Sequence, residues 1–385
     1  MRAGEVLAAA RRRAGLSQRR LGERTGYSQA TISRIERGRG QANDVRVLRH
    51  LADELGVPPQ QVGLSPVVVE ESWALEVLRR VEASDAGTAT LLGMHAVADR
   101  LCRDYPSVAA PDLHVRASRQ LEAVVRLLDG RLTLAQHREA LVVAGWLALL
   151  AGCLDYDMGR RAAAEVTRRV AGSLGAEAGH SDIVAWSREM AAWFAVTEAR
   201  YRGTVDASRA GTVVQPAGSV AVQLAAQEAK GWARLGDHRQ VEATLERGHA
   251  LLDRLPSPAH PEHHFVIDPT KWDFYAMDCY RVVGDDAQAE AHAQEVLRLH
   301  TDVDGNERAP MRMAEAHITL GVVAARRGEL ERAAHDGGQG LTGRRKSLPS
   351  LLLPARELAS ELRSRYPREQ ATHDYVERLR ALRRS

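Results

Sequence analysis

The sequence predicts an all-α protein. Alanine, leucine and arginine are abundant, whereas aromatic residues make up only 4% of the 385 residues. Such a composition favours helix and supplies little of the β-branched and aromatic content that strands prefer. Apolar residues also recur at the three- and four-residue spacing of amphipathic helices, with glycine-containing breaks between them. We therefore expect helices nearly throughout, divided among two or three domains because the chain is long.

Basic charge is concentrated at the N-terminus. Residues 1–65 contain twelve arginines against six acidic residues, whereas the rest of the chain carries 41 basic and 44 acidic residues. A small basic head on a near-neutral body predicts that only the head meets a polyanion. We divide the chain into a head at 1–65, a short linker at 66–72 and a helical body at 73–385.

The head is predicted to form five short helices. Their expected ranges are 4–14, 18–24, 28–37, 44–55 and a short one that opens at Pro58-Pro59. Ser17 and Ser28 are suited to cap the second and third helices, because a serine hydroxyl accepts a hydrogen bond from the first turn. Gly26, between these two helices, is placed to take a left-handed turn.

The segment 28–40, SQATISRIERGRG, is the most informative stretch of the head. Ile32 and Ile35 mark one apolar face, and glutamine and arginine side chains lie on the other side. A short polar helix of this kind can be read against the major groove of DNA. Taken alone, the segment would also be compatible with a solvated arginine-rich helix.

The whole head resembles the Xre family of DNA-binding domains, the phage-repressor and Cro-like group. The resemblance extends over about sixty positions and decides against the solvated-helix alternative. The matching residues are Leu16-Ser17-Gln18, Leu21, Gly26-Tyr27-Ser28, Ile32-Ser33, Ile35-Glu36, Gly38, and Leu48 through Leu55-Gly56-Val57. Gly22 departs from the alanine that the family usually has. We expect this to cost about 1 kcal/mol of helix propensity and to leave the packing unchanged.

The resemblance implies a role for each polar residue of the segment. Gln29, Ala30 and Arg34 occupy base-reading positions, which suits their chemistry, since Gln can bond adenine, Arg guanine, and Ala a thymine methyl group. The positions that usually contact phosphate are occupied by Gln18, Ser28, Thr31 and Arg37, and Arg39 is added on charge alone. Glu36 is expected to form a structural ion pair with Arg11 of the first helix.

The body contains a loose helical repeat. Its marker is an alanine-rich helix with Trp or Tyr, a glycine-containing break, and a second alanine-rich helix. We place the breaks at Gly203-Thr204, Gly236-Asp237, Gly284-Asp285 and Gly328-Glu329, with an earlier variant near 152–155. Residues 135–345 resemble tetratricopeptide-like repeats, which implies stacked hairpins with a concave binding face. The combined plan resembles actinobacterial regulators of this build and, in architecture only, the peptide-sensing regulators of Gram-positive bacteria.

Two features of the body are candidate ligand contacts. All six tryptophans lie outside the head, at 73, 146, 186, 193, 232 and 272. For a repeat position such as Trp232 we favour core packing over ligand stacking. The insertion at 256–269 is long and polar, and we consider it a candidate lid or ligand contact. Its segment Phe265-Val266-Ile267 is compatible with an extended conformation.

Several short patterns resemble catalytic, cofactor or metal sites, but none of them has the surrounding residues that such a site requires. His260, His263, His264 and Asp268 have nothing else to support a metal site, so a solvated polar loop is favoured. Gly338-x-Gly340-x-x-Gly343 follows no strand, and close helix packing is favoured over dinucleotide binding. The adjoining near match to a phosphate loop has Arg344 where the lysine must be. We expect no catalytic residues, no cofactor and no metal.

The remaining sequence features favour a cytoplasmic protein. Cys102, Cys153 and Cys279 are widely spaced and odd in number, which fits a reducing compartment. The longest apolar run, 141–154, is shorter than the roughly twenty residues of a spanning helix, so we expect a buried helix and no membrane contact.

We therefore predict a transcriptional regulator that binds double-stranded operator DNA as a homodimer and binds a peptide or small molecule in its body. One alternative is an adaptor or antitoxin-like protein whose repeats bind a protein partner, with DNA binding for autoregulation. Another is an enzyme fused to a DNA-binding head, which no catalytic constellation supports.

Overall fold

The computed structural model describes residues 2–40, 44–64, 87–216, 218–301, 307–342 and 347–382. The chain divides into two compact units between Ala83 and Ser84, and each unit is described by itself. Within these ranges the regular elements are all helices, and the extended pairing is a single bridge between Thr301 and Glu307. The predicted all-α class is confirmed. The predicted linker, 66–72, and Trp73 lie outside the described residues.

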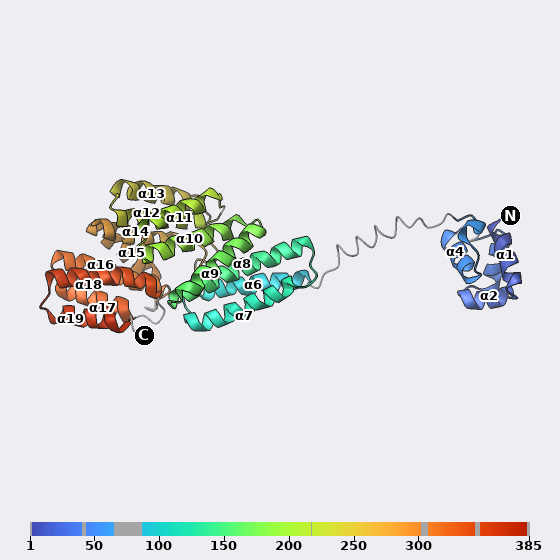
Figure 1. The fold of residues 1–385 in the computed structure, drawn as a ribbon, viewed down its shortest axis with the longest axis horizontal. Coiled ribbons are helices and arrows are strands. Elements are labelled where there is room, and N and C mark those ends of the chain that lie inside the picture. Colours follow the sequence, from blue (N-terminus) through green and yellow to red (C-terminus); the bar gives the residue numbers. More distant parts are fainter. Residues whose placement is uncertain are drawn as a thin grey trace. The chain divides into compact units, whose positions relative to one another are not determined.

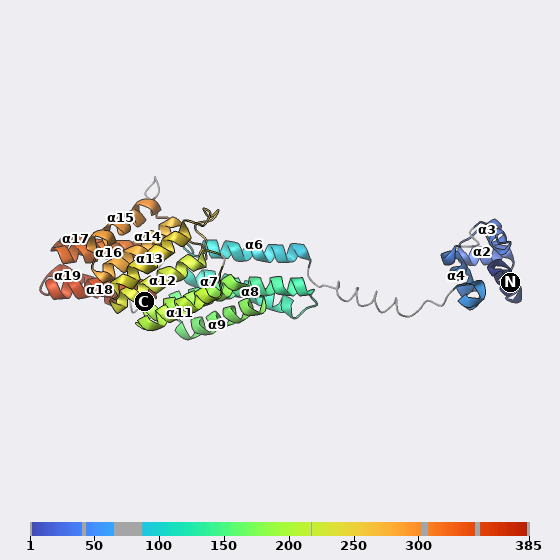
Figure 2. The same cartoon turned by 90° about the horizontal axis from the view of Figure 1, so that it is seen from above.

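The head consists of short helices around one small core (Figure 2). Their bounds are α1 (Ala3–Arg13), α2 (Gln18–Thr25), α3 (Gln29–Glu36), α4 (Val45–Glu54) and a 3-10 turn, η2 (Pro59–Val62). Leu7, Leu21, Ile32, Ile35 and Leu51 are all almost completely buried in this core. The two isoleucines three residues apart therefore fix which face of α3 points inward and which face remains outside.

Glycines set how closely the head helices approach one another. Gly26 joins α2 to α3 with φ 73°, in the left-handed region that suits glycine. A Cβ atom on Gly22 would lie 2.3 Å from the carbonyl oxygen of Tyr27, so an alanine there cannot fit without backbone movement. The packing at this position therefore differs from what we expected, because α2 lies directly against the turn. Gly4 plays the same part where α1 meets the end of α3, 2.4 Å from the Ile35 oxygen.

The body is an array of helical hairpins (Figure 1). It opens with α6 (Thr88–Asp104) and α7 (Ala110–Leu128), which lie beside the first helix of the next pair (Figure 2). The pairs that follow are α8 (Leu134–Asp157) with α9 (Arg161–Glu177), α10 (Ser181–Thr197) with α11 (Tyr201–Val213), α12 (Val220–Leu235) with α13 (His238–Leu252), α14 (Pro269–Val283) with α15 (Asp286–His300), α16 (Pro310–Arg327) with α17 (Leu330–Thr342), and α18 (Leu348–Arg365) with α19 (Gln370–Leu382). Stacked helical pairs thus form a repeat-like domain.

Three of the predicted hairpin breaks coincide with turns, and two do not. Gly236, Gly284 and Gly328 end α12, α14 and α16 in the left-handed conformation. Gly203 instead lies inside α11, and the turn before it is made by Ala199 at φ 60°. Gly152 lies inside α8, where a Cβ would come within 2.9 Å of Met190. Gly152 therefore allows α8 to pack closely against α10, and the turn comes later in the chain, at Gly159.

Helix α8 is the apolar centre of the body. It is long and apolar enough to cross a membrane by those two criteria alone, but 89% of that window is buried inside the protein. Leu147, Leu149, Leu150 and Leu154 are completely buried on different sides of the helix. Neighbouring helices cover it all round, as expected for the core helix of a soluble protein. The prediction of a buried helix at 141–154 is confirmed.

The array curls back on itself. The first helices of successive pairs, α8, α10, α12, α14, α16 and α18, pack against one another in order. Helix α18 also contacts α8 and α10, and Trp193 Nε1 donates a hydrogen bond to Ser350 Oγ over 2.8 Å. The last pair therefore meets the earliest ones, and the inner faces of these helices enclose a space.

The insertion between α13 and α14 closes one side of this space. We call residues 253–268 the strap. No strand forms in it: Phe265 lies in a turn, and residues 266–268 have no regular secondary structure. Phe265 and Ile267 are buried, and the Phe265 ring packs on Trp146 and Trp186. The strap is an anchored part of the core because its apolar side chains insert between the pairs.

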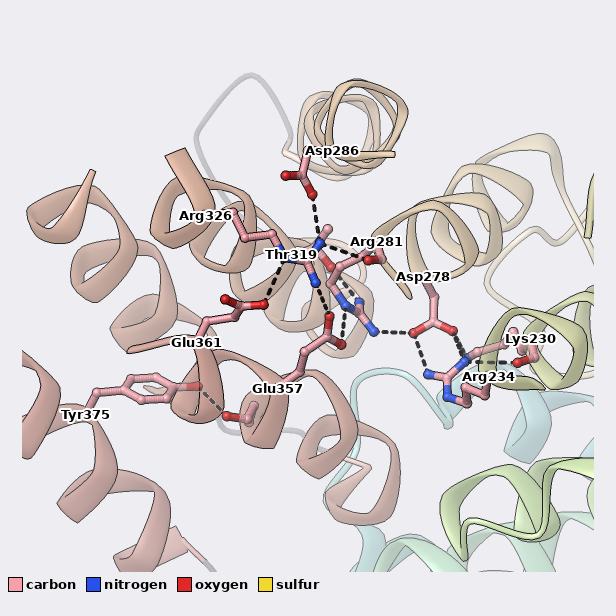
Figure 3. Close-up of polar contacts among 11 residues, drawn as sticks. Lys230, Arg234, Asp278, Arg281, Asp286, Thr319, Arg326, Glu357, Glu361 and Tyr375 are labelled. Carbon is pink, nitrogen blue, oxygen red and sulfur yellow. Dashed lines mark hydrogen bonds and ion pairs between the residues drawn. The ribbon is translucent and has the colours of Figure 1, made fainter. Parts of the chain in front are cut away.

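An ionic network joins the later pairs (Figure 3). Asp278 is almost completely buried and accepts hydrogen bonds from Arg234, at 2.8 and 3.0 Å, and from Arg281, at 2.6 Å. Arg281 also donates to Thr319 and Glu357, and Arg326 joins Glu357, Glu361 and Asp286. The network thereby ties α12, α14, α16 and α18 together, with α15 attached through Asp286.

Candidate functional site

Helix α3 presents its polar residues to solvent. Ser28 Oγ accepts from Thr31 N over 3.1 Å and caps the helix, as the sequence predicts. Ile32 and Ile35 turn inward, so Gln29, Ala30 and Arg34 are left exposed on the outer face. The three side chains assigned to base reading are therefore accessible, Gln29 and Ala30 at the start of α3 and Arg34 in its last turn.

An ion pair supports α3 from behind. Arg11 Nε lies 2.6 Å from Glu36 Oε1, and Arg11 also donates to Glu36 Oε2 and to the Leu16 carbonyl oxygen. Burial acts to raise the pKa of Glu36, but hydrogen bonds from Arg11 and Gln18 outweigh it, and the pKa lies below its usual value. The pair links α1 to the end of α3 and holds the angle at which α3 is presented.

The residues assigned to phosphate differ in how they are held. Gln18 donates to Glu36 Oε2 over 2.7 Å, so its amide already belongs to the ion pair. Arg37 folds back onto its own helix and donates to the oxygens of Ser33. Thr31 bonds to the capping Ser28 hydroxyl, and Arg39 is exposed. In this arrangement Arg37 and Arg39 offer charge at the end of α3.

Comparison with known proteins identifies the head. Residues 2–63 match the family model of a helix-turn-helix domain. No curated protein matches the chain, and no solved structure does. The protein is therefore a helix-turn-helix domain followed by an all-helical region. Because the match covers the head alone, the body must be interpreted from its own structure.

The body contains a partly open cavity of about 130 Å³. A single buried water needs roughly 10–15 Å³ by this measure, so a small organic molecule can be held. The aromatic residues of its wall are Tyr105, Trp186, Trp193, Phe274 and Tyr275, and its polar residues are Glu189, Gln223, Gln227, Lys230, Lys271, Arg312, Glu315, Ser347 and Ser350. The strap contributes Glu262 and His264 to the same wall. The cavity lies where the six inner helices face one another.

The strap is fixed at this wall by polar bonds. His264 N donates to the Cys102 carbonyl oxygen over 3.1 Å, and its ring stacks on Tyr105 with centroids 3.7 Å apart. Lys271 Nζ donates to the carbonyl oxygens of His263, His264 and Val266. Burial lowers the pKa of Lys271 to about 7. Since its hydrogen bonds all go to the strap, this lysine acts as a strap anchor.

The other two cations of the wall also have partners outside the cavity. Lys230 Nζ lies 3.6 Å from Asp278 and stands over the rings of Phe274 and Tyr275. Arg312 donates to Thr270 Oγ1 and lies 3.7 Å from Asp268. Each cation of the wall is thus compensated by an acid or a carbonyl group behind the surface.

The two buried acids of the wall are held differently. Glu189 Oε1 accepts from Gln223 Nε2 over 2.9 Å and from Gln227 Nε2 over 2.7 Å. Glu315, only 5% exposed, forms no hydrogen bond or ion pair within the part of the chain that the structure describes. Burial raises the pKa of Glu315 to about 7, although Lys230 opposes this, and burial also raises the pKa of Glu189.

The patterns set aside as metal or nucleotide sites have other structural partners. His263 lies 3.7 Å from Asp99, His260 lies 3.3 Å from Glu262, and Asp268 caps α14. Across the described ranges, no group of three or more His, Cys, Asp or Glu side chains is arranged to hold a metal ion. Gly338 and Gly340 lie inside α17, and a Cβ on Gly340 would approach the Ala314 oxygen to 2.5 Å. Gly343 lies outside the described residues.

Sequence reasoning named Trp186, Trp193 and the insertion as candidate ligand contacts, but it did not find the polar residues of the cavity wall, although a signal for them existed. Trp186, Glu189 and Trp193 follow one another at i, i+3 and i+7 along α10, which places a carboxylate inside an apolar stripe. Gln223, Gln227 and Lys230 lie at i, i+4 and i+7 on α12, again along one face. A polar stripe on the inner helix of several consecutive hairpins is the pattern that points to a shared interior site. Trp232, in contrast, packs in the core as expected.

Proposed function

We propose that the protein is a sequence-specific, DNA-binding transcriptional regulator whose helical body binds a signal in its interior cavity. The observation that carries the DNA-binding half is the helix-turn-helix match at residues 2–63. The exposed face of α3, with Gln29, Ala30 and Arg34, supplies groups that can bond base edges. The proposal contains no catalytic step and assigns the protein to the cytoplasm.

In this proposal the head is an Xre-type domain that binds as a homodimer. One helix-turn-helix domain contacts a single half-site, and two half-sites about one helical turn apart require two copies. Arg34 reads a base, whereas Arg37 and Arg39 approach phosphate. Light scattering in the presence of DNA checks this. A monomer on one half-site at physiological concentration would contradict the dimer.

The body is proposed to be a tetratricopeptide-like sensor for a small molecule. An adaptor that binds a protein or a long peptide needs an open concave face. Here the strap and the contact of α18 with α8 and α10 narrow that face, and the cavity that remains is about 130 Å³, which favours a small ligand. A partner protein that co-purifies in stoichiometric amount would favour the adaptor instead.

Genome-wide mapping of DNA binding tests the function most directly. We expect a limited set of sites that share one palindromic sequence, and a variant that combines Gln29→Ala with Arg34→Ala should lose them. Binding distributed evenly over the genome would contradict sequence-specific regulation. The comparison should be made at a fixed salt concentration, because phosphate contacts make affinity salt-dependent.

A further inference from the structure

The cavity has an unbalanced charge distribution. Its three cations are compensated by groups outside the wall, as described above, whereas neither buried acid has a cation within 4.0 Å among the described residues. An unpaired carboxyl group inside a protein is costly, and its compensation normally comes from a partner or a bound ligand. Glu315 is the clearest case, because it faces the cavity without any bond.

The wall around the two acids is aromatic. Glu189 lies between Trp186 and Trp193 on α10, and the buried Tyr275 interacts electrostatically with both Glu189 and Glu315. Ring faces attract cations, and two of these rings already accommodate the Lys230 ammonium. The indoles of Trp186 and Trp193 also line the wall and offer apolar contacts to an aromatic or aliphatic ligand body.

We propose that the cavity binds a small organic cation, an ammonium or amidinium group on an apolar body, and that Glu315 is its counter-ion. Glu189, oriented by the amides of Gln223 and Gln227, forms the second acidic contact. Trp186 and Trp193 cover the apolar part of the ligand. This inference names the ligand class of the sensor in the proposed function and can be tested without DNA.

Ligand binding then involves a proton. Because burial raises the pKa of Glu315 to about 7, the empty cavity holds a partly protonated carboxyl group. A cation binds the carboxylate form and drives the proton off. The charged groups facing Glu315 are Lys230 and Arg234 on α12 and Asp278 and Arg281 on α14. Arg234, Asp278 and Arg281 are bound to one another in the ionic network and keep their charges near neutral pH.

Calorimetric titration of the full-length protein with three probes of one shape tests the proposal. We expect benzamidine, a cation, to bind, benzamide to bind at least about tenfold more weakly, and benzoate not to bind. Equal binding of benzamide or benzoate, or no binding of benzamidine, would overturn the proposal. The outcome does not depend on DNA, so a failure here is distinguishable from a failure of operator binding.

The variant Glu315→Gln identifies the counter-ion. It should lower the affinity for benzamidine about tenfold to hundredfold, whereas Glu331→Gln, at an exposed position of α17 outside the cavity wall, should leave it unchanged. The variant should also fold, since it removes a buried carboxyl group that has no partner. Unchanged affinity in Glu315→Gln would overturn the role of Glu315.

The pH dependence gives a second readout. In the wild-type protein the affinity for benzamidine should fall about tenfold per pH unit below 7, as Glu315 takes up a proton. Lys271, whose pKa is also about 7, acts in the same direction because its protonated form repels the ligand. Glu315→Gln should flatten the profile, and the parts due to Lys271 and to Glu189, whose pKa burial also raises, should remain. A profile of the same steepness in the variant would contradict the assignment.

Discussion

The head carries the polar groups of its candidate site on its outer surface, whereas the body carries those of its candidate site in its interior. In the head, apolar residues fill a small core and the functional side chains of α3 stand outside, on one helix. In the body, four consecutive inner helices direct Glu189, Gln227, Tyr275 and Glu315 toward a common interior. A surface site of the first kind needs one correctly oriented helix. An interior site of the second kind exists only when several hairpins are assembled.

The two regions also use charge differently. The head has one ion pair behind its functional helix, Arg11 with Glu36, and both side chains are about 10% exposed or less. The body buries a continuous network in which Asp278 faces three cations. Replacing the central acid should therefore lower the free energy of unfolding more in the body than in the head. Five of the six tryptophans lie in the second unit, so tryptophan fluorescence reports mainly the unfolding of the body.

The largest effect is expected in the body network. Asp278→Asn keeps the shape of the side chain but leaves Lys230, Arg234 and Arg281 without their shared acid. We expect the free energy of unfolding of the body to fall by about 3–5 kcal/mol. Denaturant titration followed by tryptophan fluorescence measures it. The exposed control Glu295→Gln should leave the midpoint unchanged, and an equal loss in both variants would contradict a special role for the network.

Protonation of Asp278 at low pH should destabilise the body. The cations around Asp278 outweigh its burial and hold its pKa well below its usual value. Its contribution to stability is therefore present above the unfolded pKa of about 3.9 and is lost only as pH falls through the lower folded value. In Asp278→Asn the acid midpoint of the body should shift upward. An unchanged midpoint would show that other carboxyl groups control acid unfolding.

A smaller effect is expected when the ion pair of the head is broken. Glu36→Ala leaves Arg11 and Gln18 without their acceptor, so the head should lose about 1.5–3 kcal/mol. Circular dichroism should show an earlier melting step, while the tryptophan midpoint stays the same. Glu23→Ala, which removes an exposed pair with Arg19, serves as the control. A shift of the tryptophan signal would contradict independent stability of the two regions.

The outer face of α3 should separate base reading from phosphate contact. Arg34→Ala should lower specific affinity by about 1–3 kcal/mol and relax one operator position. Arg37→Ala should weaken binding on every sequence and make the salt dependence shallower. Binding-shift titrations on operator and scrambled DNA at several salt concentrations distinguish the two. Equal loss on both DNAs for Arg34→Ala would show that Arg34 contacts phosphate only.

The smallest effects test where the hairpins turn. Gly236 has φ 76° at the end of α12, so Gly236→Ala should destabilise the body by about 1 kcal/mol. Gly203 lies inside α11, and a Cβ there meets no atom closer than 3.4 Å. Gly203→Ala should therefore stabilise the body by about 0.5–1 kcal/mol. The same sign for both variants would contradict the corrected position of the turn at Ala199.

The sequence predicted the head better than the body for a physical reason. Caps, turns and core positions of the head lie within a few residues of one another, so Ser28, Gly26 and Ile32 could be assigned from local spacing. The close approach at Gly22 could not, because it depends on where the Tyr27 carbonyl oxygen lies in space. In the body, Gly203 and Gly152 resembled turn glycines by neighbouring residue types alone.

The cavity was beyond such reasoning because its residues come from distant parts of the chain. Glu189 and Glu315 are separated by more than a hundred residues and meet the same space only through the curl of the array. The length of the strap marks it in the sequence as a candidate ligand contact. Its position on the cavity wall, however, depends on the packing of Phe265 against helices far earlier in the sequence. Polar stripes on individual helices were visible, but their convergence was not.

The contact of α18 with α8 and α10 changes how the body should fold. In an open array each repeat depends on its neighbours alone, so folding can begin anywhere and the ends can fray independently. The hydrogen bond from Trp193 to Ser350 spans 157 residues. It makes the stability of the α10–α11 hairpin depend on the docking of the last hairpin, α18–α19. Contacts of such long range slow folding. Removal of α18 and α19 should therefore loosen α10 from a distance, and the wall of the cavity should be complete only after the C-terminal hairpin has docked.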